Sequence, residues 1–431
     1  MRPGGGEPDR PGRVHQLDVL RGFALFGILL VNARMMAGPY SALGGGPGAS
    51  DFDRVAAWGT TALVSTKFYL LLSFLFGYSF VIQERSARRA GAAFAPRHLR
   101  RTVGLFGIGL AHAVLLHPGD ILMTYAALAL VLYGLRGLTP RTALRIAACL
   151  VVGLSMLLLG YGLLTVAVTE PLTPDQYVPL VAHKVAAYRG GVLSVLGAHL
   201  HDLPAQLGAD LLYSPDMFAA FLAGLAAARS GLVERRGRDR AWLRKVVVRW
   251  LPVGLAGGVV TACCANWPLD SRWFLVGHAV AVLTGPALTA SYACGLLLLL
   301  GPVPEVASSA RQAPLPTPAP AMRPAAAGVL AASGRMALTH YLTQSLVLAC
   351  VFTGYGFGLY DRVGTAVVLA GCVVLYSVQL ALGAWLMERV RYGPLELLLR
   401  TVTLARRPGS RLPSSAWTGS RPAEDDLRPV P

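Results

Sequence analysis

Apolar runs recur along the chain and alternate with short polar segments. Most approach the length of about 20 residues that an α-helix needs to cross a hydrocarbon core roughly 30 Å thick. The pattern predicts an all-α fold, a polytopic transmembrane helix bundle of about ten spans. The predicted spans are residues 19–38, 61–82, 102–116, 121–135, 143–165, 217–232, 251–266, 274–300, 336–356 and 365–387.

Composition agrees with this pattern and excludes several other classes. Of the 431 residues, 54% are hydrophobic and only 14% charged, and the mean hydropathy is +0.52. A soluble domain carries about 25% charged residues. The chain is therefore neither a soluble enzyme, nor a disordered protein, nor a secreted disulfide scaffold. Its six cysteines lie in apolar runs without a Cys-x-x-Cys motif, so we expect no metal site and no disulfide framework.

The net charge of +17 is distributed in a way that predicts orientation. Basic residues gather between the apolar runs, as they do in cytoplasmic loops. With both termini cytoplasmic, 32 of the 39 Lys and Arg residues fall inside. The seven outside are Arg34, Arg54, Lys67, Lys184, Arg189, Arg272 and Arg362. We expect the basic loops to contact anionic membrane lipids and no nucleic acid to be bound.

Four segments interrupt or flank the predicted membrane domain of residues 17–400. Residues 169–216 form an acid-rich outer loop, within which residues 192–212 are apolar enough to re-enter the membrane. Residues 302–327 are rich in Pro and Ala and predict a cytoplasmic linker. Residues 1–16 and 401–431 lack apolar runs and predict disordered cytoplasmic ends without a signal peptide.

Polar residues inside a predicted span are costly, so they often mark function. In the first span, Asp18 is placed to cap the helix and to neutralise Arg21. At about 100° per residue, Arg21 and Asn32 share one face and lie roughly 16 Å apart along the axis. Two interpretations remain open. Arg21 snorkels and Asn32 ties helices together, or this face lines a cavity whose Arg21 binds a phosphate.

The third and fourth spans form a predicted hairpin around Pro118-Gly119, because these residues favour a tight turn. His112 lies in the outer half of the third span, and Asp120 begins the fourth. Gly104, Gly107 and Gly109 would let another helix approach closely. An ordinary core histidine and helix cap are one interpretation. The other is catalytic, with His112 as general base and Asp120 as its orienting carboxylate.

The ninth span begins with Arg335 and carries His340 and Gln344 on one face. These groups either hydrogen-bond neighbouring helices or belong to a binding site. In the outer loop, His199 and His201 are spaced two residues apart and do not converge on a metal if they are helical. Near the C-terminus, Pro394 predicts the start of a short interfacial helix with Glu396 and Arg400 as an i,i+4 pair.

Five motifs stand in order along the chain. They are Leu17-Asp18-x-Leu20-Arg21-Gly22-x-Ala24-x-x-Gly27-Ile28-x-x-x-Asn32; Lys67-Phe68 with Ser73-Phe74-Leu75-Phe76-Gly77; Gly119-Asp120-Ile121-Leu122-x-x-Tyr125-Ala126; Gly334-Arg335-Met336-Ala337-Leu338-Thr339-x-Tyr341-x-x-Gln344-Ser345; and Tyr392-Gly393-Pro394-Leu395-Glu396. Together they resemble the YeiB-like bacterial membrane proteins, a family of unknown function. The resemblance runs from about residue 13 to 400 and implies a multi-pass protein of the bacterial inner (plasma) membrane. His340 stands where the resemblance leads us to expect Asn.

The opening motif is also similar to that of transmembrane acyltransferases of the acyltransferase-3 and heparan-glucosaminide acetyltransferase types. That resemblance implies no bound cofactor but acyl-CoA as a donor substrate, with a cell-envelope component as acceptor. Asn32 stands where the acyltransferase-3 pattern has a histidine, and residues 33–58 contain no histidine. A base must therefore come from elsewhere, and His112 is the candidate. The alternative function is a transporter or flippase for a small anionic or lipid-linked solute.

Overall fold

The computed structural model describes residues 15–39, 49–171, 174–300 and 322–405, and every regular element within these ranges is a helix. This confirms the all-α fold. The elements are α1 (His15–Ala37), α3 (Asp51–Leu63), α4 (Lys67–Arg89), α5 (Phe94–Leu115), α6 (Ile121–Gly134), α7 (Pro140–Val168), α8 (Pro174–Arg189), α9 (Val192–Arg229), α10 (Leu232–Arg236), α11 (Arg240–Ala265), the short 3₁₀ turn η1 (Ser271–Trp273), α12 (Phe274–Leu300), α13 (Met322–Arg335), α14 (Ala337–Phe352), α15 (Thr365–Met387) and α16 (Pro394–Leu404).

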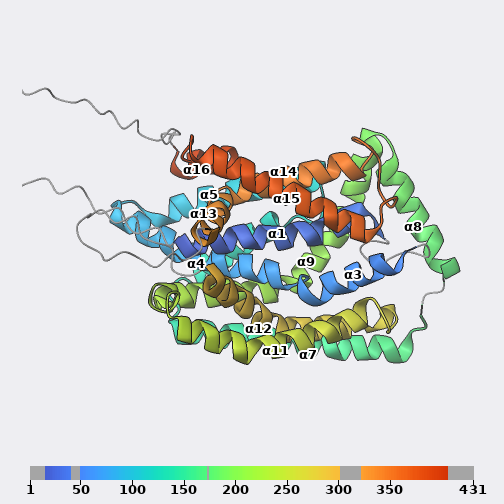
Figure 1. The fold of residues 1–431 in the computed structure, drawn as a ribbon, viewed down its shortest axis with the longest axis horizontal. Helices are drawn as coiled ribbons and strands as arrows, with labels where there is room; N and C mark the ends of the chain where they lie inside the picture. The colour runs from blue at the N-terminus through green and yellow to red at the C-terminus, as the bar shows by residue number, and fades with distance from the viewer. Residues whose placement is uncertain (1–14, 40–48, 172–173, 301–321, 406–431) are drawn as a thin grey trace, which may run out of the picture.

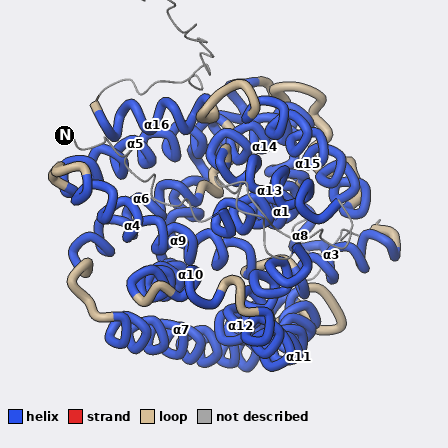
Figure 2. The backbone as a smooth tube through the Cα atoms, turned by 60° about the vertical axis from the view of Figure 1, so that its left-hand side comes forward, coloured by secondary structure: helices blue, strands red, loops and turns tan. Residues whose placement is uncertain are grey.

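The long helices run roughly side by side in one bundle (Figure 1). In Figures 1 and 2, α1, α4 and α9 lie in the middle, between α7, α11 and α12 on one side and α5, α14, α15 and α16 on the other. The start of α1 and α16 lie at one end of the bundle, here called the α16 end, and α8 lies at the other, the α8 end. The two described ends of the chain therefore lie on the same side.

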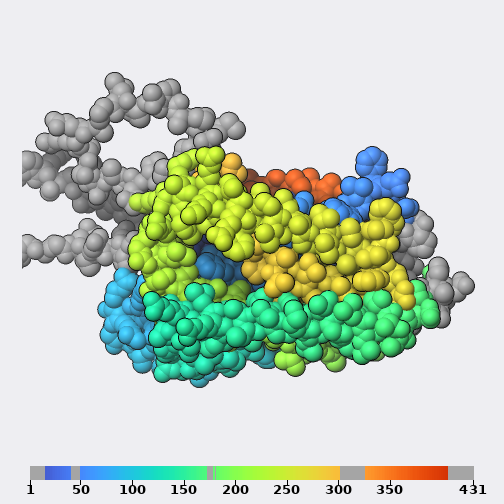
Figure 3. All heavy atoms as spheres, turned by 90° about the horizontal axis from the view of Figure 1, so that it is seen from below, coloured from blue at the N-terminus to red at the C-terminus, as the bar shows by residue number. Residues whose placement is uncertain are grey.

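Burial separates the central helices from those at the surface. Within the described residues, seven helical segments are long and apolar enough to cross a membrane, and α6 and α14 are shorter apolar helices. In the most apolar part of α1 and α9, 61% of the residues are buried, against 28% in α7, α11 and α15. Figure 3 shows the face built by α7, α11 and α12, which is hollowed between α7 and α11. Exposed apolar side chains on such helices are typical of a surface that contacts lipid.

Some predicted boundaries agree with the structure, and others differ. The bounds of α12 and α15 coincide with the predicted spans. Residues 169–216, predicted as an outer loop, instead contain α8 and the first 25 residues of α9. At 38 residues, α9 is about 57 Å long, so it crosses far more than a hydrocarbon core. The segment 192–212 is thus continuous with the predicted sixth span rather than a separate re-entrant piece.

The predicted second span is broken into two helices. α3 ends at Leu63 and α4 begins at Lys67, and Thr66 between them has a positive φ of 73°. The carbonyl of Thr61 accepts a hydrogen bond from Lys67 Nζ at 3.2 Å, and that of Leu63 accepts one from Tyr292 at 2.9 Å. Backbone carbonyls that lose their helical hydrogen bonds at a break inside a membrane protein need other donors such as these. Lys67, which the predicted topology assigns to the outer side of the membrane, is 2% exposed, so it is buried within the bundle.

Two motif glycines let α1 and α13 cross in close contact. A Cβ on Gly22 would lie 2.2 Å from the carbonyl oxygen of Leu330, and one on Gly334 would lie 1.8 Å from that of Asp18. Neither position has room for a side chain. The first and fourth sequence motifs are therefore neighbours in space. α13 itself begins at Met322, inside the predicted linker 302–327, whose residues up to 321 lie outside the described part of the chain.

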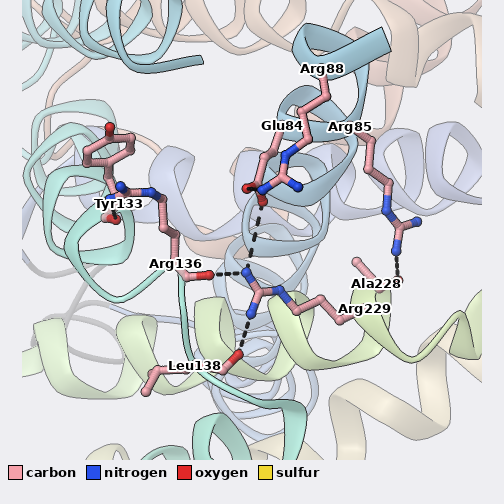
Figure 4. Close-up of polar contacts among 8 residues, drawn as sticks. All are labelled: Glu84, Arg85, Arg88, Tyr133, Arg136, Leu138, Ala228 and Arg229. Carbon is pink, nitrogen blue, oxygen red and sulfur yellow. Dashed lines mark hydrogen bonds and ion pairs between the residues drawn. The ribbon is translucent and has the colours of Figure 1, made fainter. Parts of the chain in front are cut away.

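Arginines at the α16 end hold α4, α9 and the α6–α7 connection together (Figure 4). Arg229, in the last turn of α9, donates to the backbone carbonyls of Arg136 and Leu138 and lies 3.9 Å from Glu84. Glu84 also pairs with Arg88 at 2.8 Å. Part of the positive charge that predicted a cytoplasmic face thus has a structural role. The predicted disordered ends lie outside the described residues, apart from the first helical residues of α1 and the end of α16.

Candidate functional site

His112 and Asp120 meet at the α5–α6 hairpin. The hairpin forms as predicted, with α5 ending at Leu115 and α6 beginning at Ile121. His112 Nδ1 lies 2.9 Å from Asp120 Oδ1, off the direction of a linear hydrogen bond, and both residues are 2% exposed. Catalytic hydrogen bonds are often poorly aligned until substrate binds. The other ring nitrogen of His112, Nε2, is buried and has no hydrogen-bond partner.

Asp120 is fixed in place by contacts other than His112. Its Oδ2 accepts a hydrogen bond from the backbone N–H of Met123 at 2.9 Å, so Asp120 caps α6. Tyr341 from α14 donates to Oδ1 at 3.4 Å, and its ring lies 5.0 Å from the imidazole of His112. The two interpretations of Asp120 are thus compatible, because one carboxylate caps the helix with one oxygen and faces the histidine with the other.

The three glycines of α5 differ in what they permit. A Cβ on Gly109 would lie 2.5 Å from Asp120 Oδ2 and 2.8 Å from the backbone nitrogen of Met123. One on Gly104 would touch Leu399 of α16 at 3.0 Å. Gly107 has nothing within 4 Å, so the expectation that it receives a neighbouring helix is wrong. Gly109 is the glycine that allows Asp120 to reach its position.

A cavity of about 350 Å³ lies beside this hairpin at the α8 end. Leu116 and His117 line it, and their backbone N–H groups both bond to the carbonyl oxygen of His112. It also receives side chains from the end of α1, from α8, from α9 and from the segment after α14. The lining residues are Met35, Met36, Pro39, Leu116, His117, Pro118, Lys184, Tyr188, His199, Asp202, Ala205, Gln206, Thr353 and Tyr360. We call it the α8-end cavity.

His117 and His199 line the α8-end cavity, and His112 lies close to His117. Burial, together with the nearby His112, His199 and Lys184, lowers the pKa of His117 to about 3. His117 is therefore neutral at physiological pH. No pattern in the sequence joins His199, whose partner Val114 lies 85 residues earlier, to this hairpin. His201 is exposed, as expected for two residues on opposite sides of a helix, and no cluster suited to a metal ion occurs among the residues described.

Asp18, Arg21 and Arg335 lie together toward the α16 end. Asp18 is 3% exposed and pairs with Arg21 at 2.8 Å, as predicted. α1 already runs from His15, so Asp18 lies within its first turn rather than capping it. Arg21 also donates to Ser79 of α4 at 2.5 Å. Arg335 is the last residue of α13, next to the Gly334 that lies against the backbone of Asp18.

Asn32 lies on α1 four residues before Met36 of the cavity, and it is half-buried like Arg21. Its neighbour Arg34 is 5% exposed and donates to the carbonyl of Ala57 at 3.2 Å and to Thr61 at 3.3 Å. Arg34, predicted to lie outside, therefore holds α3 against α1.

His340 and Gln344 engage in hydrogen bonds between helices. His340 Nδ1 lies 3.0 Å from the hydroxyl of Ser333 in α13. Gln344 donates to Gln379 of α15 at 2.8 Å, and Gln379 donates back to Thr343 at 2.9 Å. These contacts agree with the helix-packing interpretation of this stretch.

Glu396 forms a contact that differs from the expected one. It accepts hydrogen bonds from the backbone of Leu338 at 2.7 Å and from the hydroxyl of Thr339 at 2.6 Å. The pair expected with Arg400 is thus replaced by a tie between α16 and the start of α14, and Arg400 lies over the ring of Tyr392 at 4.7 Å. The fifth motif, at the start of α16, therefore contacts the fourth motif, at the start of α14.

Comparisons with known proteins agree with the motif resemblance. Residues 227–406 match the model of a family described as "Protein of unknown function (DUF418)". The chain is 27% identical to the uncharacterized protein YxaH of Bacillus subtilis (strain 168), with 91% of this chain and 94% of the relative covered. It is 28% identical to an uncharacterized 39.9 kDa protein in the amylase 3' region of Bacillus acidopullulyticus, over 92% of this chain and 95% of the relative. It is 26% identical to the uncharacterized protein YeiB of Escherichia coli (strain K12), over 90% and 95%. The matches to these three relatives extend over almost the whole chain, and the chain is therefore similar to the DUF418 model in its C-terminal part and to YeiB-like proteins along most of its length.

Proposed function

We propose that this protein is a multi-pass enzyme of the bacterial inner (plasma) membrane that resembles transmembrane acyltransferases and modifies a cell-envelope component. The observation that carries the proposal is the pairing of His112 Nδ1 with Asp120 at 2.9 Å, with Nε2 buried and unpartnered, in a hairpin whose residues Leu116, His117 and Pro118 line the α8-end cavity. A histidine held by a carboxylate through one nitrogen presents the other as a base. Seven apolar helices and the basic α16 end support the membrane location.

The chemistry follows from this geometry. His112 Nε2 takes the proton from an acceptor hydroxyl or amine as that group attacks the thioester carbonyl of an acyl-CoA donor. The thiolate leaves and receives the proton back from the imidazolium, so the products are the acylated acceptor and free CoA. Asp120 stabilises the transient positive charge on His112. General-base catalysis of this kind is worth about 10²–10⁴ in rate.

The donor's phosphates would bind at the opposite end, at Arg21. This arginine is on α1, 14 residues before the cavity residue Met35, which corresponds to about 21 Å along the helix axis. The planar guanidinium suits a phosphate group. The acyl arm of the donor therefore has to reach between the two ends of α1. We propose that Asp18, Asn32 and Arg335 support that binding face.

The test uses a strain that lacks the gene and is complemented with variants. Envelope lipids and cell-wall fractions are compared by mass spectrometry for a missing acyl group, with signals normalised to the amount of inserted protein. His112→Gln should abolish the modification, because an amide takes no proton, and Asp120→Asn should reduce it less. His278→Gln is the matched control, because His278 is another imidazole within the bundle, packed at 4.3 Å on Tyr213 in a different part of the fold. Full modification by well-inserted His112→Gln would remove the proposed base.

A transporter or flippase for a small anionic or lipid-linked solute is the second candidate. The break between α3 and α4, with the buried Lys67 at the start of α4, favours it, because discontinuous helices line many transporter sites. Proteoliposomes separate the two candidates. Solute movement without acyl transfer, lost in Lys67→Met and kept in His112→Gln, would favour transport.

A further inference from the structure

We infer that the α8-end cavity binds an uncharged, hydroxyl-rich group of the sugar or polyol type, one hydroxyl of which donates a hydrogen bond to His199. The bound group would be the acceptor of acyl transfer. Only this role as acceptor rests on the proposed function. Binding itself is a separate property that is measured without turnover.

The first argument comes from the protonation of His199. Its Nδ1 lies 2.9 Å from the carbonyl oxygen of Val114, in the last turn of α5. That carbonyl has no N–H group four residues later, because residue 118 is proline. A carbonyl only accepts, so Nδ1 of His199 carries the proton and Nε2 carries a lone pair. Nε2 is buried and has no hydrogen-bond partner, and the residue is 1% exposed.

The unpartnered nitrogen of His199 favours a ligand that donates hydrogen bonds. Nε2 of His117, which also lines the cavity, is likewise buried without a hydrogen-bond partner. A buried polar atom without a partner costs about 1–3 kcal/mol. A ligand that supplies an O–H donor to Nε2 of His199 removes this cost there, whereas one that carries only acceptors does not.

The charges of the cavity favour an uncharged ligand. Lys184 and Asp202 pair with each other at 2.7 Å, and Tyr188 donates to the same carboxylate oxygen at 2.8 Å. The cation and the anion of the cavity therefore compensate each other. His117 adds no charge, because burial holds its pKa near 3. Neither a phosphate nor a quaternary ammonium group meets an uncompensated opposite charge here.

The shape and walls of the cavity suit a single small ring. Its volume of about 350 Å³ is near the lower limit for ligand pockets, roughly 300 Å³. Tyr188 and Tyr360 are stacked with their centroids 4.7 Å apart and an interplanar angle of 11°. Together with Met35 and Pro118 they give the cavity apolar walls. A sugar ring combines apolar faces with a polar rim, so it is complementary to both kinds of lining.

Binding is tested on the full-length protein in nanodiscs by saturation-transfer NMR. Methyl β-D-glucopyranoside and myo-inositol are the probes, and methyl phosphate and choline chloride are the charged comparisons. We expect saturable binding of the two polyols and none of the charged compounds. His199→Phe should weaken polyol binding roughly two- to tenfold, the effect of one lost hydrogen bond. His201→Phe, on the same helix but exposed, should bind as the wild type does.

A second measurement needs no variant. In protein labelled with ¹⁵N-histidine, Nε2 of His199 should be unprotonated, and its signal should shift when polyol is added. Preference for methyl phosphate or choline, a protonated Nε2, or unchanged polyol binding by His199→Phe would overturn the inference. Polyol binding without any acyl transfer would contradict only the proposed function. Acyl transfer that depends on His112 without polyol binding would contradict only this inference.

Discussion

Gly109 is the residue whose replacement should disturb the candidate site most directly. A methyl group at this position would lie 2.5 Å from Asp120 Oδ2 and 2.8 Å from the backbone nitrogen of Met123. Asp120 and the start of α6 would therefore have to move away from α5. Overpacking of this kind costs about 1–3 kcal/mol, and loss of the Asp120 cap adds about 1 kcal/mol. Alanine in place of glycine within a helix returns about 0.5–1 kcal/mol, which leaves a net destabilisation of about 1–3 kcal/mol.

Gly107 provides the matched control, because it is on the same helix and a Cβ there has nothing within 4 Å. Gly107→Ala should raise the free energy of unfolding by about 0.5–1 kcal/mol through helix propensity alone. The assay is reversible unfolding of the purified protein by SDS titration in mixed micelles, together with envelope modification in cells. Gly109→Ala should be less stable than Gly107→Ala by about 2–4 kcal/mol and should lose activity as Asp120 leaves His112. Equal stability and equal activity of the two variants would refute the role given to this close approach.

Three other predictions concern binding, pH and topology. Arg21→Lys should insert normally but lose envelope modification, because a lysine lacks the planar fork; a neutral effect would mean that Arg21 only snorkels. Burial lowers the pKa of His117 to about 3. Between pH 6.5 and 3, His117 is therefore protonated in the unfolded chain and neutral in the folded protein. The free energy of unfolding should therefore fall as the pH drops from 6.5 toward 3, by about 1.4 kcal/mol per pH unit for this one group. In His117→Gln the pH dependence of the free energy of unfolding should lack this contribution, which unfolding titrations at several pH values would measure. In a cysteine-free background, a cysteine at His201 should react with an impermeant reagent from outside and one in 302–327 only from the cytoplasm; labelling of His201→Cys from the cytoplasm would reverse the topology.

How far the fold follows from sequence depends on where polar residues fall. α12 and α15 were predicted to the residue because each is a mostly apolar stretch without any Asp, Glu, Lys or Arg. α9 was recognised only in its last part, because Asp202 and Asp210 and two internal prolines interrupt its apolar pattern. In the folded protein those carboxylates have partners, such as Thr124, which donates to Asp210 at 3.2 Å. The apolar run alone does not contain this information, since the partners come from other helices.

The candidate site shows the same division between local and distant contacts. His112 and Asp120 were paired from sequence because they belong to one hairpin of nine residues. His199 was not joined to them, because only the folding of α9 against α5 brings it to the carbonyl of Val114. Pro118 was the one local indication, because it has no N–H group to donate to the carbonyl of Val114. That carbonyl therefore requires a donor from another part of the chain. Likewise, nothing local predicted that Gly22 meets α13, although both segments stood out as motifs.

The packing of side chains around the middle of α1 bears on the choice between the two proposed functions, acyl transfer and transport. Leu25 and Leu29 of α1 are each 1% exposed, and Ile28 between them is 7% exposed. Packed apolar side chains therefore fill the middle of the bundle between Arg21 and the α8-end cavity. A whole polar solute would need α1 to separate from its neighbours to pass this layer, and would be desolvated against hydrocarbon at a cost of several kcal/mol per unpaired polar group. A slender acyl arm is itself apolar and needs only a few side chains to change rotamer, while the charged part of the donor remains at Arg21. The observed packing is thus less costly for acyl transfer than for transport, and this difference, added to the His112–Asp120 pair, is the reason that the enzyme stands first.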